Sequence, residues 1–265
     1  LIAADKEREG EMLRALGRRY EFLTFVDTGA LLHQVMIKRP AVIICEDTAP
    51  PNGGNKFRER IRVDPDTHTV PIILTGNGSN VPKMNNVIDR YLLWPFKKSQ
   101  IIDCISDLIN VAAEQQWEAL PTLQKETLKL TVEEYQDVAT AIENGDPIDY
   151  HKASDSCTPL VKAIQDNGHH ELLKSVQNHH NYTYVHSLRV ATLLTMFGHG
   201  IGMDEDNMNI LATGGLLHDV GKLVTPDNIL NKPGKLDDEE WPIMQDHVVQ
   251  SRDLLQAGDD VSKGA

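Results

Sequence analysis

Short apolar runs alternate with longer amphipathic stretches along the first 112 residues. The runs lie at 1–4, 22–26, 41–45, 70–74 and 91–93. Continuous apolar runs of this length are typical of strands that are buried on both faces, as in a parallel sheet covered by helices. The alternation therefore predicts a five-stranded α/β domain of the flavodoxin-like type over residues 1–112.

Helical periodicity replaces this alternation in the rest of the chain. Apolar residues recur at helical spacing over 98–117, and this extension is a candidate signalling helix or homodimer interface. Thr131 and Glu134 form a capping-box pattern, which predicts that a helix begins there. We expect a helical linker over 113–150 and an all-helical bundle over 151–265.

Composition narrows the classes of partner. The net charge of −13 argues against nonspecific binding of duplex DNA, which depends on many basic contacts. Three cysteines, Cys45, Cys104 and Cys157, do not suggest a disulfide framework. The sequence shows no long apolar run and no signal-peptide pattern, so we expect a cytoplasmic protein without a membrane segment. Because it starts at Leu1 and stops in a polar run, we expect a fragment.

The most informative residues are a histidine and a carboxylate side by side, His218 and Asp219, at the end of an apolar helix. The Gly214-Gly215 pair weakens that helix, which makes sense where another helix or a metal centre comes close. His186 and His247 lie on separate predicted helices, each on the apolar stripe. Three imidazoles and one carboxylate can therefore converge from three helices.

Each histidine alone is more often a hydrogen-bonded core residue than a metal ligand. A buried carboxylate, however, is costly without a partner or a metal. Taken together, the four residues favour a divalent metal centre, since imidazole and carboxylate suit such ions. Two histidine pairs in polar sequence at helix edges are not assigned to it: His169-His170 and His179-His180.

Residues 178–256 resemble the first half of an HD-GYP domain, a branch of the HD superfamily. The matching pieces are 182–187 (YTYVHS), 216–222 (LLHDVGK), 226–236 (PDNILNKPGKL) and His247. The histidine-aspartate pair followed by glycine and lysine is common to many HD proteins, whereas the long match over 226–236 is much more specific.

The resemblance implies a metal-dependent phosphodiesterase that acts on cyclic di-GMP. His186, His218, Asp219 and His247 would then be metal ligands, with Asp219 bridging two ions and Lys222 close to the substrate phosphate. Both Asp219 and Lys222 would take part in catalysis, because bridged ions and an ammonium stabilise the charge of the transition state. Iron or manganese is the first expectation for the two divalent ions.

The chain departs from the HD-GYP pattern in two places. Some members carry a glutamate four residues before the first histidine and use it for a third metal, but Tyr182 stands there, which favours two ions. The family's His-His pair, its last aspartate ligand and its Gly-Tyr-Pro signature follow the equivalent of His247, beyond Ala265.

The first 112 residues resemble a response-regulator receiver domain whose phosphorylation chemistry is altered. Glu46 occupies the phosphoacceptor position, Thr75 matches the switch hydroxyl, and Trp94 replaces the lysine expected before Pro95. Phosphorylation is therefore not expected, because the phosphoryl group would lack its counter-ion. Lys6 is a candidate ion-pair partner of Glu46, with a plain structural role as the favoured alternative.

Together these patterns predict a metal-dependent cyclic di-GMP phosphodiesterase regulated by a non-phosphorylatable receiver-like domain. One alternative keeps the HD hydrolase and changes the substrate to another cyclic dinucleotide. The other is a regulatory module that retains metal but has no turnover. In the full-length sequence, a following His-His-Glu and Asp-Gly-x-Gly-Tyr-Pro would favour turnover, and their absence would favour the regulatory module.

Overall fold

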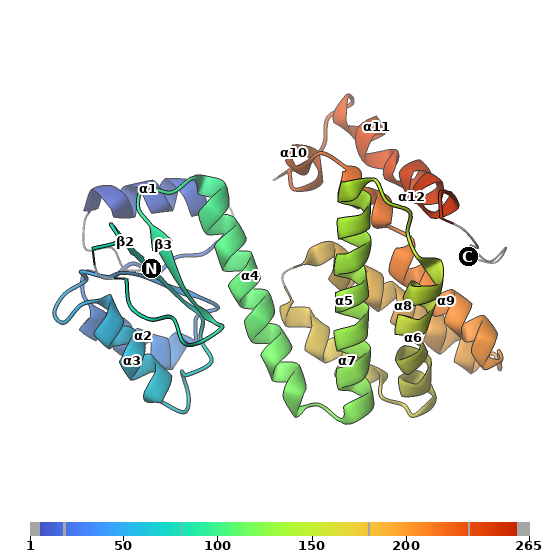
Figure 1. Ribbon diagram of the computed structural model, residues 1–265, viewed down its shortest axis with the longest axis horizontal. Helices are drawn as coiled ribbons and strands as arrows, with labels where there is room; N and C mark the ends of the chain where they lie inside the picture. The colour runs from blue at the N-terminus through green and yellow to red at the C-terminus, as the bar shows by residue number, and fades with distance from the viewer. Residues whose placement is uncertain (1–5, 18–19, 80, 180, 233, 259–265) are drawn as a thin grey trace. The chain divides into compact units, whose positions relative to one another are not determined.

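A computed structural model describes residues 6–17, 20–79, 81–179, 181–232 and 234–258 (Figure 1). The chain divides into two compact units, residues 1–115 and 116–265. The first unit combines a small parallel sheet with helices, and the second is helical. Among the described residues, no helix has the length and apolarity needed to span a membrane.

The first unit is built on three parallel strands in the order β1-β2-β3, namely β1 (Ile43–Glu46), β2 (Ile72–Gly76) and β3 (Asp89–Leu93). Its helices are α1 (Lys6–Leu16), α2 (Thr28–Lys38), α3 (Gly54–Val63) and α4 (Lys98–Gln116). Ile43 pairs with Ile72, which pairs with Asp89.

Side chains alternate between the two faces of this sheet, so each strand contributes to two apolar clusters. Ile43 and Leu74 pack with α2 and α3, through residues such as Leu31 and Phe57. Ile44 and Ile73 pack with α1 and α4, whose contributors are Met12, Leu16, Ile101 and Ile105. Burial on both faces explains why the strands read as continuous apolar runs.

The predicted α/β class of the first unit is confirmed, and three of the expected strands are present. The run 1–4 lies outside the described residues. The expected strand at 22–26 was wrong in extent, because only an isolated bridge at Phe25 is formed. Asp27 begins α2 directly afterwards by accepting a hydrogen bond from the Ala30 amide, which leaves little room for a strand.

Glu46 is buried at the end of β1, in register with Thr75 of β2. The guanidinium of Arg8 lies 3.7 Å from the Glu46 carboxylate and 5.4 Å from the centre of the Trp94 ring. The side chain of Lys6, for which we expected this ion pair, lies outside the described ones. Arg8 thus provides a cation beside Glu46, where the receiver resemblance places the phosphoacceptor, and its guanidinium also lies over the Trp94 ring.

The second unit packs long helices around one core: α5 (Thr122–Asn144), α6 (Tyr150–Gln165), α8 (Tyr182–Gly200) and α9 (Glu205–Leu217). Shorter helices complete it: α7 (His169–Ser175), α10 (Asp227–Leu230), α11 (Glu240–Gln245) and α12 (His247–Gln256). Short 3-10 segments lie at 117–119, 176–178 and Val220–Val224. Leu128, Leu160, Leu188 and Leu216 are fully buried in the core.

The segment 113–150, which we expected to be a linker, supplies a core helix of the second unit. Leu128 and Tyr135 of α5 are buried there. The capping-box prediction was wrong, because Thr131 lies inside α5 and its hydroxyl donates to the Thr127 carbonyl. The apolar stripe extends upstream of Thr131, so burial carries the helix back to Thr122.

The extension at 98–117, which we expected to be a signalling helix or dimer interface, corresponds to α4 and the start of the next 3-10 segment. Ile101, Ile105 and Leu108 of this helix are buried within the core of the first unit. The apolar stripe that suggested an interface therefore packs against the core of its own unit. The homodimer stays a prediction.

Candidate metal centre

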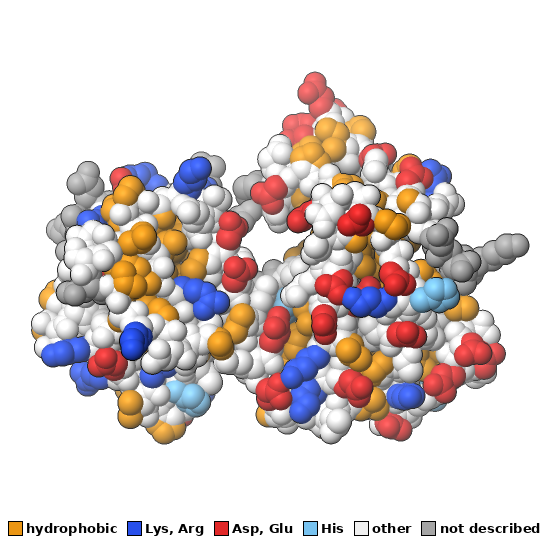
Figure 2. Space-filling view, in the orientation of Figure 1, with side chains coloured by type: hydrophobic (Ala, Val, Ile, Leu, Met, Phe, Trp, Pro, Cys, Tyr) orange, Lys and Arg blue, Asp and Glu red, His pale blue; other side chains and the backbone are white. Residues whose placement is uncertain are grey.

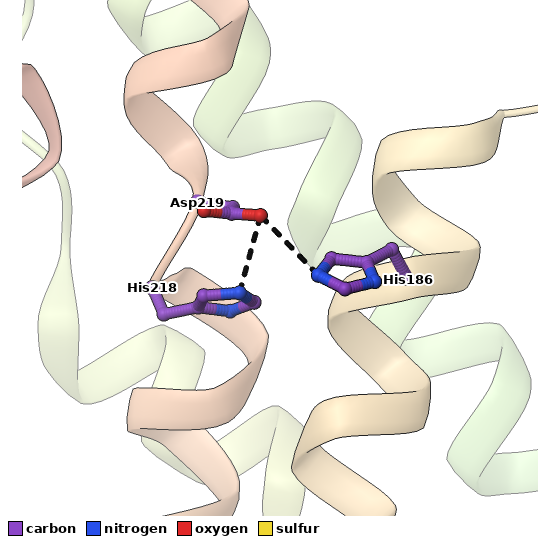
Figure 3. Close-up of side chains that lie close together, drawn as sticks. All are labelled: His186, His218 and Asp219. Carbon is purple, nitrogen blue, oxygen red and sulfur yellow. Dashed lines mark ion pairs between the residues drawn. The ribbon is translucent and has the colours of Figure 1, made fainter. Parts of the chain in front are cut away.

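The Asp219 carboxylate lies at the meeting point of three imidazoles. The Nε2 atoms of His218 and His186 lie 3.1 and 3.4 Å from its Oδ2. The Nε2 of His247 lies 3.2 Å from its Oδ1. Figure 3 shows the rings of His186 and His218 on neighbouring helices, both turned toward the carboxylate. The four predicted ligands are thus brought together.

Helix ends determine where the first two histidines stand. The Asn181 side chain accepts a hydrogen bond from the Tyr184 amide, which begins α8 and puts His186 in its second turn. α9 ends at Leu217, so His218 is its C-cap residue and Asp219 follows. Both ligands of the pair therefore lie where a helix gives way to a loop, with room to reach one point.

Gly215 sets the distance between these two helices. A Cβ atom at this position would lie 2.6 Å from the Ala191 Cα and 2.7 Å from the Ala191 nitrogen. The expectation that a glycine before His218 permits a close approach is confirmed for Gly215. At Gly214 a Cβ atom would meet none of the described atoms within 4 Å.

Backbone hydrogen bonds fix which nitrogen of two histidines faces the carboxylate. The Nδ1 of His218 lies 2.9 Å from the Gly215 carbonyl, and the Nδ1 of His247 contacts the Met244 carbonyl. A carbonyl only accepts, so each Nδ1 carries the proton. In the neutral ring Nε2 then has a free lone pair, which is the usual arrangement for a metal-binding histidine.

These donor atoms fit a divalent ion. Lone pairs of several imidazoles directed at one carboxylate repel each other unless protons or a cation lie between them. An ion with ligands at about 2.0–2.2 Å, as for zinc, separates neighbouring ligand atoms by about 3.0–3.5 Å. The observed separations of 3.1 to 3.4 Å lie in that range. The donor set suits an ion of borderline softness.

The electrostatics keep Asp219 ionised. Burial raises the pKa of Asp219, but hydrogen bonds from His218 and Lys222, together with their charges, outweigh burial and hold this pKa well below its usual range. The Lys222 ammonium contacts the Asp219 carboxylate across one helical turn. Lys222, which was predicted to lie close to a substrate phosphate, is therefore near the candidate metal centre and pairs with Asp219 in this structure.

The two histidines of Figure 3 differ in basicity. Burial and the nearby Lys222 charge lower the pKa of His186. The hydrogen bond with Asp219 raises the pKa of His218. His186 therefore gives up a proton to a cation more readily than His218, whose proton Asp219 helps to hold.

The remaining histidines and lysines that drew attention lie elsewhere. His179 is buried and its ring stacks on Trp117 at 5.8 Å between centroids, so it is a core residue. His180 lies outside the described residues. Lys232, in the segment 226–236 that matches the HD-GYP pattern, pairs with Glu240 and Asp237. Tyr182 stacks on His186 at 6.3 Å and remains mostly exposed.

One residue of this region was missed from the sequence. Ser251 is buried, and its hydroxyl oxygen accepts a hydrogen bond from the Gly221 amide at 2.8 Å. The available signal was its position four residues after His247, which places both on one face of α12. A serine among polar neighbours gives no other indication of burial.

Comparison with known proteins supports the same region. Residues 183–262 match the family model described as HD domain. A 3'3'-cGAMP-specific phosphodiesterase 2 of Vibrio cholerae is 40% identical over 86 residues, which cover 32% of this chain and 16% of that protein. A cyclic di-GMP phosphodiesterase of Pseudomonas aeruginosa is 34% identical over 112 residues, which cover 42% of this chain and 27% of that protein.

A longer match is more distant. The cyclic di-GMP phosphodiesterase response regulator RpfG of Xanthomonas campestris pathovar campestris is 23% identical over 223 residues, which cover 82% of this chain and 52% of that protein. A crystal structure of a candidate response regulator from Chloroflexus aurantiacus covers 40% of this chain and 93% of its own, with 23% identity and a TM-score of 0.35.

The matched segments cover between 16% and 52% of the curated relatives named here. The family match nevertheless includes the helices and loops that carry all four converging residues. Residues 183–262 of the helical unit therefore match an HD domain, and they include the group His186, His218 and Asp219 that could hold a metal ion.

Proposed function

We propose that this chain belongs to a phosphodiesterase of the HD-GYP type that hydrolyses cyclic di-GMP. The observation that carries the proposal is the approach of three imidazole Nε2 atoms to the single carboxylate of Asp219. The relatives that act on cyclic dinucleotides by name support the substrate class. The specific match over 226–236 supports the HD-GYP branch.

His186, His218, Asp219 and His247 would hold the metal, with Asp219 bridging two divalent ions, iron or manganese first. Such ions activate water and neutralise charge on the phosphate. The carbonyls of Gly215 and Met244 keep two rings in the tautomer that presents Nε2. The low pKa of Asp219 keeps a bridging carboxylate ionised across the physiological range.

Lys222 would serve the substrate rather than the ions. Its ammonium pairs with Asp219 through Oδ2, the same oxygen that faces His186 and His218. Once Asp219 binds cations, its attraction for the ammonium falls, and Lys222 can turn toward a phosphate oxygen. Charge stabilisation by a positioned cation contributes to phosphoryl transfer without further covalent chemistry.

The charge of the protein makes a local cation necessary. Acidic side chains are spread over the face of the helical unit shown in Figure 2, and the chain carries a net charge of −13. A cyclic dinucleotide has two phosphates and meets this field unfavourably. Bound metal ions make the electrostatic potential positive at the centre. An anionic substrate is therefore expected to bind at the ions and not elsewhere on this face.

We also propose that the first unit regulates the helical unit without accepting a phosphoryl group. Glu46 is buried and has the Arg8 guanidinium 3.7 Å away. An arginine cannot lose its charge, so the acid at the phosphoacceptor position keeps a permanent counter-ion. This reading predicts no incorporation of phosphate from acetyl phosphate into the protein.

The test is metal analysis and cyclic di-GMP cleavage by the complete protein that contains this chain. His218→Ala and Asp219→Ala are expected to lose bound metal and cleavage together, while His169→Ala, a histidine outside the centre, retains both. Metal content unchanged in the first two variants would refute the site. Metal without cleavage in the unmutated protein would favour the non-catalytic module, and cleavage of another cyclic dinucleotide alone would change the substrate.

A further inference from the structure

The third histidine stands on the least buried part of the helical unit. His247 is the first residue of α12, which follows α11 directly. Within residues 240–256, all of them described, Ser251 is the one buried residue. Leu254 and Leu255 are only partly buried, against a cluster that includes Leu217. With so little apolar burial, the position of His247 depends on the contacts close to it.

A buried hydrogen bond joins α12 to the loop that carries the histidine-aspartate pair. Ser251 lies one helical turn after His247, on the same face. The amide of Gly221, two residues after Asp219, donates a hydrogen bond to the Ser251 hydroxyl oxygen at 2.8 Å. Both atoms are buried. One hydrogen bond therefore connects the backbone beside Asp219 to the helix of its third imidazole.

The shape of the backbone reinforces this connection. A Cβ atom on Gly221 would lie 2.1 Å from the His247 carbonyl oxygen and 2.6 Å from the Ser251 nitrogen. Only a residue without a side chain lets the first turn of α12 lie on this loop. Both residues thus fix the first turn of α12 against the loop. Gly221 leaves space for it, and Ser251 accepts the hydrogen bond.

We propose that Ser251 is a positioning residue for the metal centre, which acts by holding His247 against Asp219. This inference rests on the proposed function, because it assigns a residue to the same centre. Loss of the hydroxyl leaves the buried Gly221 amide without its acceptor, so α12 moves away from the loop. His247 then contributes less to the ion, while His186, His218 and Asp219 still bind it.

Cobalt(II) binding to the purified chain, followed by visible absorption, tests the proposal without any turnover. Ser251→Ala is expected to weaken cobalt binding roughly tenfold, as is usual for partners that orient metal ligands. Ser251→Thr retains the hydroxyl and is expected to recover most of the affinity. Gln256→Ala, an exposed neutral position on the same helix, is the matched control and should bind as the unmutated chain does.

A double-mutant cycle separates positioning from general stability. In a His247→Ala background, Ser251→Ala is expected to cause no further loss, because the two residues act through one ligand. An equal additional loss in that background would refute the proposal, and so would full affinity in Ser251→Ala alone. If Ser251→Ala does not fold, Gly221→Ala decides in its place, with weakened binding expected. An unmutated chain that binds no cobalt would instead overturn the proposed function itself.

Discussion

Two adjacent glycines on α9 are predicted to respond to alanine in opposite ways. A Cβ atom at Gly214 meets none of the described atoms within 4 Å, whereas at Gly215 it would lie 2.6 Å from the Ala191 Cα of α8. The gain in helix propensity is the same at both positions, about 1 kcal/mol. Only Gly215→Ala must also push apart two backbones.

The magnitudes follow from these contacts. Overpacking of a tight interface costs about 1–3 kcal/mol, and more where backbone rather than a side chain must move. Gly214→Ala is therefore expected to raise the free energy of unfolding by up to about 1 kcal/mol. Gly215→Ala is expected to lower it by up to about 2 kcal/mol, which is the overpacking cost less the propensity gain of about 1 kcal/mol.

Thermal unfolding followed by circular dichroism measures both effects. In a protein of this size, each kcal/mol moves the Tm by roughly 2–4 °C, so the two variants should lie on opposite sides of the unmutated chain. Gly215→Ala should also weaken metal binding, because it shifts His186 relative to His218, whose ring centroids lie 5.3 Å apart. Equal Tm values for the two variants would contradict the close approach of α8 and α9.

The other predictions concern charged residues in both units. Lys222→Met should retain bound metal and lose most of the cleavage rate, and a parallel loss of metal would show that the ammonium serves the ions. Burial raises the pKa of Glu134 to about 7. The folded protein therefore binds the Glu134 proton more tightly than the unfolded chain does, which stabilises the fold at low pH. This stabilisation is complete below the pKa of an unfolded glutamate and is lost as the pH rises through about 7. Glu134→Gln should remove up to about 3 kcal/mol of pH dependence between pH 5 and 8 in urea unfolding, and an unchanged slope would contradict the burial of this acid. Acetyl phosphate should leave the protein unlabelled, and labelling that disappears in Glu46→Gln would refute the interpretation of the first unit.

Predictions from the sequence were most reliable at positions where a single physical requirement determines the type of residue. The buried strands of the first unit, such as 41–45, read as apolar runs because both sheet faces are covered. The imidazoles of His186, His218 and His247 that meet Asp219 could be predicted because each lies on the apolar stripe of its own predicted helix or at its end, beside or within reach of a carboxylate. Gly215 was read as a point of close approach, and Ala191 lies there.

Two of the failures come from tertiary packing and one from a local helix cap. Thr131 carries a capping pattern, yet burial of Leu128 extends α5 upstream of it. Asp27 begins α2 where the apolar run at 22–26 suggested a strand. Ser251 looked like a surface residue until α12 was placed on Gly221. The contacts of Leu128 and Ser251 are not local in sequence, so no periodicity reports them, whereas the Asp27 cap is a local contact with the Ala30 amide.

The central claim is that three histidines and one aspartate hold two divalent ions, and anomalous X-ray diffraction from crystals grown with manganese or iron(II) tests it most directly. Peaks within about 2.0–2.3 Å of an Asp219 oxygen are the expected result, with each of the Nε2 atoms of His186, His218 and His247 at the same distance from one of them. No peak among these atoms, with metal bound elsewhere on the chain, would contradict it.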